Sequence, residues 1–233
     1  MKICAFGLPA LTRGKHNLKD PRLDAADKLV EAKKKTYAQV DVVAEDELVD
    51  ADAVLTNPDG LLELTFKDLD FIETRLGRGP AADEQAALLK LKAQLEADKT
   101  VLTAGLSPEE LAPLTIHAFV SKRPIIVATP EEIAAPDALM IRAFKECGYI
   151  SFLTVGGKEN RAWPIPAGLT AWEAAGTIHT DIQKGFIRAE ITSYADFIEA
   201  GGETQAKRAG KQRLELKTYV MQDYDVASFR FNK

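Results

Sequence analysis

The pattern of apolar and polar positions in residues 1–147 predicts an α/β domain. Short apolar runs, each with the length of a buried strand, lie at Met1 to Leu8, Gln39 to Ala44, Ala53 to Thr56 and Lys122 to Ala128. Between the first two, Pro21 to Lys35 predicts a helix, with proline at its start and lysines in its last turn. Strands that alternate with helical segments are typical of a parallel sheet.

A second pattern interrupts this domain. Leu61 to Leu76 and Ala82 to Asp98 have apolar residues at helical spacing, and Asn57-Pro58-Asp59-Gly60 before them is a turn signal. The two segments predict an antiparallel helical hairpin, inserted over about residues 61–114. Ser107 with Glu110, and Thr129 with Glu132, have the spacing of capping boxes and predict two further helix starts.

Residues 148–233 have a different pattern, in which short predicted strands surround one predicted helix. Thr170 and Glu173 form a third capping box and predict the start of a helix, and Tyr194 to Lys207 predicts one or two short helices. A sheet that clasps one helix is a β-grasp, or ubiquitin-like, fold, and we expect this second domain to have it. The predicted strands are Ile150 to Val155, Arg161 to Ile165, Phe186 to Ile191, Leu216 to Met221 and Ala227 to Phe231.

Composition and charge limit the classes of function. Hydrophobic residues make up 46% and charged residues 28% of the chain, as in ordinary globular proteins, and no apolar run is long enough for a membrane span. The two cysteines, Cys4 and Cys147, do not have the spacing of a disulfide or a metal site. Free thiols suit a reducing compartment, so we expect the chain to be cytoplasmic. Residues 1–149 hold 19 basic and 25 acidic residues and residues 150–233 hold 11 and 10, so any RNA contact belongs to a local patch of the second domain. No DNA specificity is expected.

Three runs in the second domain carry a family resemblance. They are ISFLTVGGKENRAWPI (Ile150 to Ile165), AAGTIHTDIQKGFIRAEI (Ala174 to Ile191) and YVMQDYDVASFRFN (Tyr219 to Asn232). Together they resemble the TGS-containing C-terminal domain of the YchF-type GTPases and ATPases, an Obg-related branch of the P-loop proteins. The resemblance implies a ligand-binding, RNA-associated or ribosome-associated regulatory role.

The first domain resembles the G domain of that family only in part. It keeps Gly7-Leu8-Pro9 and Asp20-Pro21-Arg22-Leu23-Asp24, but Gly7 lies too far from Gly14-Lys15 for a P-loop, and His16 stands where the motif needs Ser or Thr. The family's D-x-A-G segment is also missing, and Thr129 follows the strand where the family has a base-reading asparagine. We therefore predict a reduced, P-loop-like domain that does not hydrolyse nucleotides, so that the chain is not an enzyme. Nucleotide binding through Gly7, Gly14 and Lys15 is the alternative.

Candidate binding residues remain in the second domain. His179, Asp181, Lys184 and Arg188 belong to the run that is closest to the family. A structural role, with His179 and Asp181 pinning a loop to the sheet, competes with contact to a ligand or RNA. A solvated surface is the competing interpretation for the other basic candidates, which are Lys158, Arg161, Lys207, Arg208, Lys211 and Arg213.

Three aromatic positions carry further expectations. Trp163 and Trp172 could stack on bases, but their predicted positions in a strand and an amphipathic helix favour core packing. Tyr224 stands where the family has glycine in a turn, so a positive φ there carries an energetic cost.

From these patterns and the family resemblance, we expect a non-hydrolysing binding module with RNA or the ribosome as its partner. The alternatives are an atypical nucleotide-binding protein and a scaffold that binds a protein through the helical hairpin. The histidines, His16, His117 and His179, have no metal-ligand spacing, and we predict no metal, cofactor or catalytic residue.

Overall fold

The computed structural model describes residues 1–232 and divides into two compact units. Unit 1 consists of Met1–Lys15 and Asp41–Leu139, and unit 2 joins His16–Val40 to the chain from Met140 onward. The expected domains, 1–147 and 148–233, therefore differ from the units in one main respect. The segment 16–40 leaves the first domain and folds with the second. Lys233 lies outside the described residues.

A parallel sheet forms the base of unit 1. The strand order is β2-β4-β1-β5-β6, and the neighbours β4-β1, β1-β5 and β5-β6 all pair in parallel. The strands β1, β4 and β5 are largely buried, as their apolar sequences predict. The elements are β1 (Lys2–Ala5), β2 (Gly14–Asn17), β4 (Gln39–Val43), η1 (Glu45–Asp50), β5 (Ala53–Thr56), β6 (Ile125–Val127), α5 (Pro130–Ala134) and α6 (Pro136–Glu146), of which β2, β4 and α6 cross the boundary between the units.

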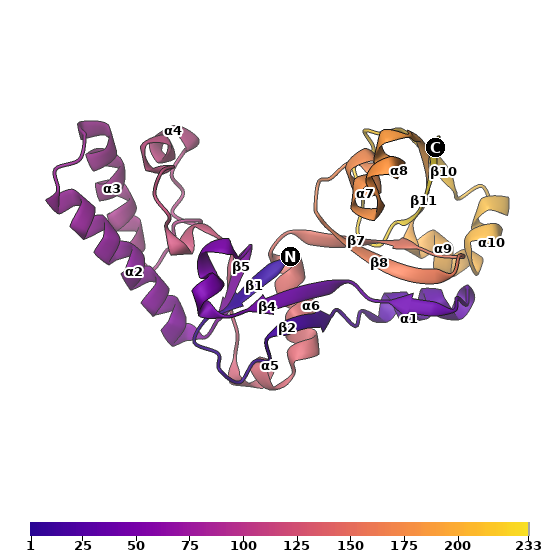
Figure 1. Ribbon diagram of the computed structural model, residues 1–233, viewed down its shortest axis with the longest axis horizontal. Coiled ribbons are helices and arrows are strands. Elements are labelled where there is room, and N and C mark those ends of the chain that lie inside the picture. The colour runs from indigo at the N-terminus through magenta and orange to yellow at the C-terminus, as the bar shows by residue number, and fades with distance from the viewer. Residues whose placement is uncertain (233) are drawn as a thin grey trace. The chain divides into compact units, whose positions relative to one another are not determined.

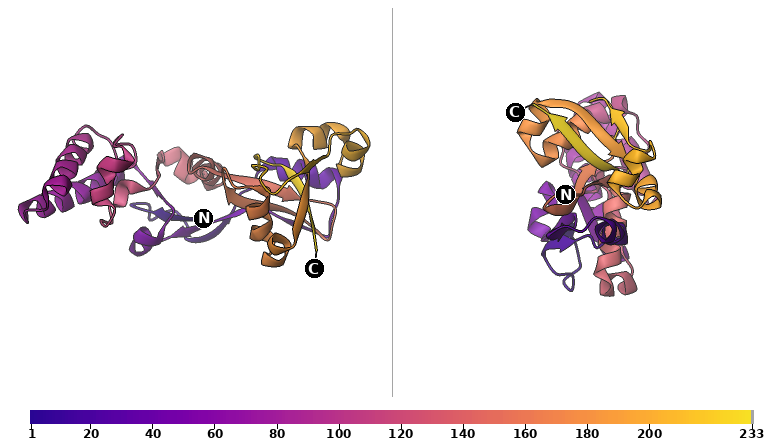
Figure 2. Two further views of the ribbon diagram at one scale, coloured as in Figure 1. Left: turned by 90° about the horizontal axis from the view of Figure 1, so that it is seen from above. Right: turned by 90° about the vertical axis from the view of Figure 1, so that its right-hand side faces the viewer.

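The predicted helical hairpin is present, and α2 and α3 run side by side in both Figures 1 and 2. Asn57 to Gly60 is the start of a helix and not a free turn, because the Asn57 side chain accepts a hydrogen bond from the Gly60 amide and caps α2. Short helices follow the hairpin and complete its apolar core around Leu88, Leu91 and Phe119. The elements are α2 (Pro58–Gly77), α3 (Ala82–Leu95), α4 (Pro108–Leu111), η2 (Ala112–Leu114) and η3 (Val120–Lys122).

Two carboxylates hold the hairpin to the segment that follows it. Asp68 is 3% exposed and accepts hydrogen bonds from the amides of Val120 and Ser121 and from the Ser121 hydroxyl. Burial raises the pKa of Asp68. Glu84 accepts two bonds from Arg75, at 2.6 and 2.8 Å, and lies 2.8 Å from Nε2 of His117. These hydrogen bonds lower the pKa of Glu84 to about 2.

Unit 2 has a six-stranded mixed sheet of order β10-β9-β11-β7-β8-β3. Its apolar face packs under α7 around Phe152, Ala174 and Ile191. Figure 1 shows α7 and α8 on one side of the β7–β8 pair and α1 on the other. The elements are α1 (Pro21–Leu29), β3 (Lys34–Thr36), β7 (Tyr149–Thr154), β8 (Glu159–Pro166), α7 (Ala171–Ile178), α8 (Thr180–Lys184), β9 (Phe186–Thr192), α9 (Tyr194–Ala200), α10 (Glu203–Arg208), β10 (Arg213–Glu215) and β11 (Val226–Phe231).

The segment 16–40 differs from its prediction because it pairs with a distant strand. The helix ends at Leu29, and Lys34–Thr36 forms β3 instead of a last helical turn, in parallel register with Glu159–Arg161 of β8. Asn160 secures this arrangement. Its fully buried amide donates to Asp27 and to the Val30 carbonyl, and its oxygen accepts from the Gly156 amide.

An arginine joins α1 to the turn before β11. The guanidinium of Arg22 bonds to Asp20 at 2.7 Å and to Asp223 at 2.7 Å, and lies 3.6 Å from the centre of the Tyr224 ring. Tyr224 has a φ of 64° and is only 3% exposed. The turn therefore has the positive φ whose cost argued for a different turn type, and burial and stacking on Arg22 offset that cost.

One strand of the second domain lies elsewhere than predicted. β10 covers Arg213–Glu215, and the predicted strand Leu216 to Met221 makes only an isolated bridge between Val220 and Thr170. The fold class is nevertheless confirmed, with a parallel α/β unit that carries a helical hairpin and a mixed α+β unit. No helix within residues 1–232 has the length and apolar character needed to cross a membrane.

Candidate functional site

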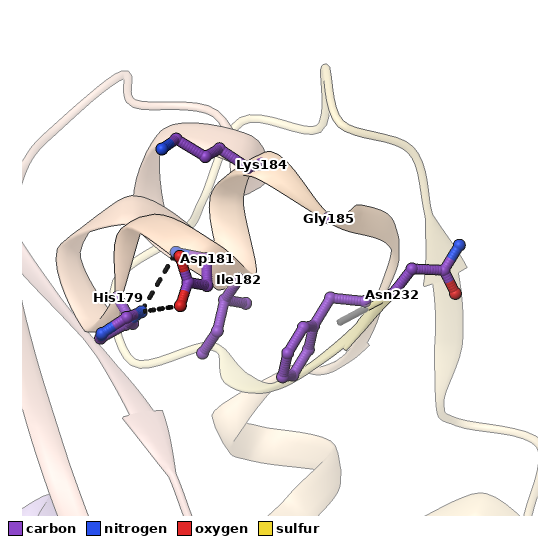
Figure 3. A pocket seen from close by; sticks show the side chains of 7 residues that line it. His179, Asp181, Ile182, Lys184, Gly185 and Asn232 are labelled. Atoms are coloured by element: carbon purple, nitrogen blue, oxygen red, sulfur yellow. Dashed lines mark hydrogen bonds and ion pairs between the residues drawn. The ribbon is translucent and has the colours of Figure 1, made fainter.

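A wide hollow of unit 2 lies at α8, within the run that is closest to the family. It has a volume of about 750 Å³ and is lined by His179, Asp181, Ile182, Lys184, Gly185, Phe231 and Asn232. Ile182 and the 37% exposed ring of Phe231 give it an apolar part, and the remaining side chains are polar or charged. Figure 3 shows Lys184 and Asn232 extending from opposite sides of this hollow. Polar groups converging on an apolar wall are typical of ligand sites.

His179 and Asp181 interact with each other and not with the sheet. Nδ1 of His179 accepts a hydrogen bond from the Asp181 amide at 3.1 Å and lies 3.4 Å from Oδ2 of Asp181 (Figure 3). Both side chains are largely exposed, at 62% and 71%. The proposed pinning of the loop to the sheet is not what the geometry shows, and both groups can reach a ligand.

Gly185 is required for space and not for an unusual backbone angle. Its φ is −86°, which any residue can adopt. A Cβ at this position would lie 2.0 Å from the carbonyl oxygen of Asn232, and the Asn232 amide donates to the Gly185 carbonyl at 2.9 Å. The glycine therefore lets the end of β11 pack closely against the loop that bounds the hollow.

Two arginines face each other on strands β9 and β11, close to the α8 hollow. In the β9–β11 register, Arg188 lies directly across from Arg230. Arg230 bonds to Glu190, whereas the described hydrogen bond of Arg188 goes to the carbonyl of its neighbour Ile187. Like charges in directly opposed positions repel each other, so this pair favours an anion that could bridge it. Arg230 was not predicted from the sequence, because the residue that faces Arg188 depends on strand register.

The remaining basic candidates are scattered, and several are neutralised. Lys207 lies 3.7 Å from Glu190, and Arg213 bonds to Glu215 at 3.0 Å. Lys211 bonds to Asp196 at 3.0 Å, and this hydrogen bond raises the pKa of Lys211. Arg161 stacks on Trp163 at 3.9 Å. Lys158, in the turn between β7 and β8, and Arg208, at the end of α10, are exposed.

The two tryptophans differ from each other. Trp163 packs against the core, stacked on Phe152, and its Nε1 donates to the Thr154 hydroxyl. Trp172 is 43% exposed, so the prediction of core packing is wrong for it. The alanines of α7, Ala171, Ala174 and Ala175, occupy the buried face, and Trp172 lies outside that face.

The nucleotide-binding candidates of unit 1 lie on different strands. Gly7 follows β1 with a φ of 66°, and its amide donates to the Glu45 carboxylate at 2.9 Å. Gly14 and Lys15 begin β2, and β4 lies between β2 and β1, which separates Lys15 from β1 by roughly 10 Å at the usual strand spacing. Arg13 donates to the carbonyls of Ala5, Leu8 and Leu11 and so fills the loop between these strands.

Metal-ligand side chains do not gather in the described part of the chain. No group of three or more His, Cys, Asp or Glu residues within residues 1–232 has a geometry that could hold a metal ion. The polar side chains around the α8 hollow include one acid and one imidazole, which is too few for a structural metal site.

Comparison with known proteins identifies the second unit. The family model YchF-GTPase_C, described as "Protein of unknown function (DUF933)", matches residues 149–232. A protein of Pasteurella multocida (strain Pm70) is 55% identical over 94 residues, which cover 40% of this chain and 26% of that protein. A protein of Bacillus subtilis (strain 168) is 36% identical over 153 residues, which cover 66% of this chain and 41% of that protein. Both are named ribosome-binding ATPase YchF. The chain thus matches less than half the length of either relative.

A solved structure supports the fold over the whole chain. The YchF GTPase of Schizosaccharomyces pombe superposes with a TM-score of 0.75 over 98% of this chain and 97% of that one, at 17% sequence identity. At this identity the likeness concerns the fold alone.

The prediction that the chain is not an enzyme is contradicted. The relatives that match it are named ATPases, and this finding conflicts with the prediction. The prediction relied on three departures from the family's motifs, at the P-loop, at the D-x-A-G segment and at Thr129, and departures from motifs do not establish the class of the protein. The domain match at residues 149–232, the named relatives and the shared fold together support the predicted resemblance to the YchF-type family, and residues 149–232 match the family's C-terminal domain.

Proposed function

We propose that this protein associates with the ribosome and contacts RNA there through the TGS-like domain of unit 2. The relatives are named for ribosome binding, and the family model covers residues 149–232 of this chain. The α8 hollow and the Arg188–Arg230 pair both lie inside that range. Ribosome binding, for which the relatives are named, is thus proposed for this chain, with the contact in residues 149–232.

The opposed arginines are the observation that carries the proposal. Arg188 has no acidic partner among the described residues, and Arg230 shares Glu190 with Lys207. Lys184, at the rim of the hollow, likewise has no described ion pair. The end of the β9–β11 pair thus presents positive charge that the domain itself does not neutralise. Guanidinium groups bind phosphate oxygens bidentately, so an RNA backbone is a ligand that would relieve the repulsion.

Sedimentation with purified ribosomes tests the proposal on the full chain. The variant Arg188→Gln with Arg230→Gln should weaken binding about tenfold and reduce the slope of log K against log salt by about 1.4, as expected for two lost phosphate contacts on a single strand. Arg78→Gln removes an exposed cation of unit 1 and serves as the matched control. Equal sedimentation of the double variant and the control would refute the RNA contact at these arginines.

As a second candidate function, we propose that unit 1 binds ATP at the carboxyl end of β1. Open parallel sheets bind ligands where the chain leaves a central strand for neighbours on both sides, and β1 lies between β4 and β5. Gly7, Glu45 and Asn57 meet at this point. The Glu45 carboxylate takes the Gly7 amide that a phosphate would need, so Glu45 competes with the ligand.

Calorimetric titration with magnesium and ATP tests this candidate. Binding is expected, and Glu45→Gln should tighten it about threefold to tenfold, because the anionic competitor for the Gly7 amide is removed. Glu63→Gln, on the exposed surface of α2, is the control for a general change of charge. No heat from the wild type or from Glu45→Gln would refute the site.

A protein partner for the helical hairpin remains a separate proposal. Leu102 and Ile116 are 53% and 81% exposed, beside a hollow of about 170 Å³ lined by Val101, Leu111 and Phe119. Substituting both exposed residues by serine should abolish a hairpin-dependent protein contact and leave ribosome sedimentation unchanged. Identical sets of retained proteins for the wild type and the variant would remove this proposal.

A further inference from the structure

The exposed indole of Trp172 is the largest apolar side chain of unit 2 that its own domain leaves open. It stands in the first turn of α7, where 43% of its surface is exposed, although the alanines beside it are buried. The hollow next to it has a volume of about 290 Å³ and is lined by Thr170, Glu173, Lys217 and Thr218 together with the indole. Small-ligand sites begin at about this size, roughly 300 Å³.

Most polar groups around this hollow already have partners. Thr170 and Glu173 bond to each other in the capping box, at 2.6 Å between hydroxyl and carboxylate. The amides of Ala171 and Trp172 donate to the carbonyls of Tyr219 and Lys217. The start of α7 is therefore not an open anion site.

What the hollow leaves open is an aromatic face and a cation. The ammonium of Lys217 forms no ion pair among residues 1–232, and the Thr218 hydroxyl has no described hydrogen bond. An aromatic plane next to a lysine matches the two parts of a nucleotide, since the indole can stack on a base and the ammonium can contact a phosphate. A protein loop would have no comparable need for the cation.

Trp172 is placed so that one RNA strand could contact it and also reach the α8 hollow. Trp172 begins α7, and His179, which lines that hollow, follows the end of the same helix. Seven residues of helical rise separate the two by about 10 Å. A few nucleotides of single-stranded RNA could span both places.

We propose that Trp172 and Lys217 form a subsite that stacks one unpaired base of single-stranded RNA. This proposal rests on the RNA-contact role of unit 2 and names the form of RNA it takes. The subsite acts by stacking, so it discriminates little between bases and requires that the base be unpaired.

Tryptophan fluorescence gives a direct measurement. The chain has two tryptophans, so Trp163→Phe leaves Trp172 as the single reporter. A saturable quench is expected when an eight-nucleotide oligouridylate or oligoadenylate is added to the full chain, and a duplex of the same length should quench far less. Oligonucleotide binding, followed independently by anisotropy of a labelled strand, with unchanged Trp172 emission would overturn the subsite. So would an equal quench by the duplex.

Substitutions in the otherwise unaltered chain supply a second measurement that does not depend on Trp163→Phe. Trp172→Ala and Lys217→Gln should each weaken oligonucleotide binding about tenfold, and Trp172→Phe should restore most of the loss. Leu214→Ala, which trims another exposed apolar side chain of unit 2, should have no effect. If Trp172→Ala binds the oligonucleotide as tightly as the wild type does, and the wild type still sediments with ribosomes, the subsite is overturned. If the wild-type protein does not sediment with ribosomes, the wider proposal is refuted instead.

Discussion

Unit 1 and unit 2 use their charged side chains in different ways. In unit 1, Asp68 and Glu84 are bonded to donors of neighbouring segments and hold the helical hairpin in place. In unit 2, Lys184, Arg188 and Lys217 have no acidic partner within the described chain. Groups that secure a fold are bonded internally, whereas cations without an acidic partner are available to an external anion.

The contrast also exists inside unit 2. One group of its ion pairs lies where α1 meets the turn at Asp223, around Arg22, and further pairs join Glu190, Asp196 and Glu215 to nearby cations. The unpaired cations lie at α8, on β9 and after β10. The same sheet therefore carries a closed, internally bonded region and an open, positively charged one, and this division decides which substitutions should affect stability and which should affect binding.

The two units can be followed separately in solution. Both tryptophans and all five tyrosines lie in unit 2, at residues 37, 149, 163, 172, 194, 219 and 224. Aromatic fluorescence thus reports the unfolding of unit 2. Far-ultraviolet circular dichroism measures helix content, so it also reports the unfolding of the long helices α2 and α3 of unit 1.

The largest expected effect is on unit 1. Asp68→Ala leaves three buried donors without an acceptor, and we expect a loss of about 3 kcal/mol in the free energy of unfolding. Urea unfolding followed by circular dichroism measures it, with the exposed Asp70→Ala as control. A loss below about 1 kcal/mol would show that the bonded carboxylate is not what holds the hairpin.

In unit 2 the corresponding test is Arg22→Ala. Removing the guanidinium leaves Asp20, only 7% exposed, without its partner and frees the ring of Tyr224, so we expect a loss of about 2 kcal/mol in unfolding followed by fluorescence. Arg22→Lys should recover only part of this loss, because an ammonium cannot bond to both carboxylates in the same plane. Full recovery with lysine would contradict that geometry.

A smaller effect is expected from acid. The pKa of Glu84 is about 2 in the folded protein, below its ordinary value of 4.5, so its stabilising contribution is complete above pH 4.5 and is lost as the pH falls toward 2. The difference in unfolding free energy between wild type and Glu84→Gln should therefore shrink from pH 5 to pH 2. Asp68, whose raised pKa acts in the opposite direction, is common to both proteins and cancels. A difference that is constant with pH would exclude this account.

The smallest effect is a gain. Arg188→Gln relieves the repulsion from Arg230 across the strand pair, so unit 2 should become more stable by up to about 0.5 kcal/mol even though ribosome binding weakens. Fluorescence-detected unfolding of the single variant gives the number. A loss of more than about 1 kcal/mol would mean that Arg188 serves the fold, and the contrast between the two regions would then fail.

Local patterns in the sequence predicted local structure well. All three capping boxes, at Ser107, Thr129 and Thr170, are present, because each needs only a side chain and an amide three residues apart. The positive φ at Tyr224 was not predicted, because a residue other than glycine in this turn favoured a different turn type. The strand β3 could not be predicted, since Lys34 pairs with Glu159 and local propensity favoured a helix.

The candidate site shows the same limit. The run around His179 pointed to the α8 hollow, because its residues are adjacent in sequence and in space. Phe231 was missed, since it reaches the hollow only through the pairing of β9 with β11, and that pairing also places Arg230 opposite Arg188. The exposure of Trp172 was missed for a related reason. Helical spacing identifies a buried face but does not say which flanking residues a neighbouring segment will cover.

The pairing of β3 with β8 bears on how the second domain can be isolated. A fragment that begins at residue 149 contains the whole family match but lacks β3, and so it would expose the edge of β8 over residues 159–161 with its unpaired amides and carbonyls. It would also leave the buried amide of Asn160 without Asp27 and Val30. Such a fragment should self-associate through that edge, and adding residues 16–40, as a separate peptide or through a circularly permuted chain, should return it to the monomeric state.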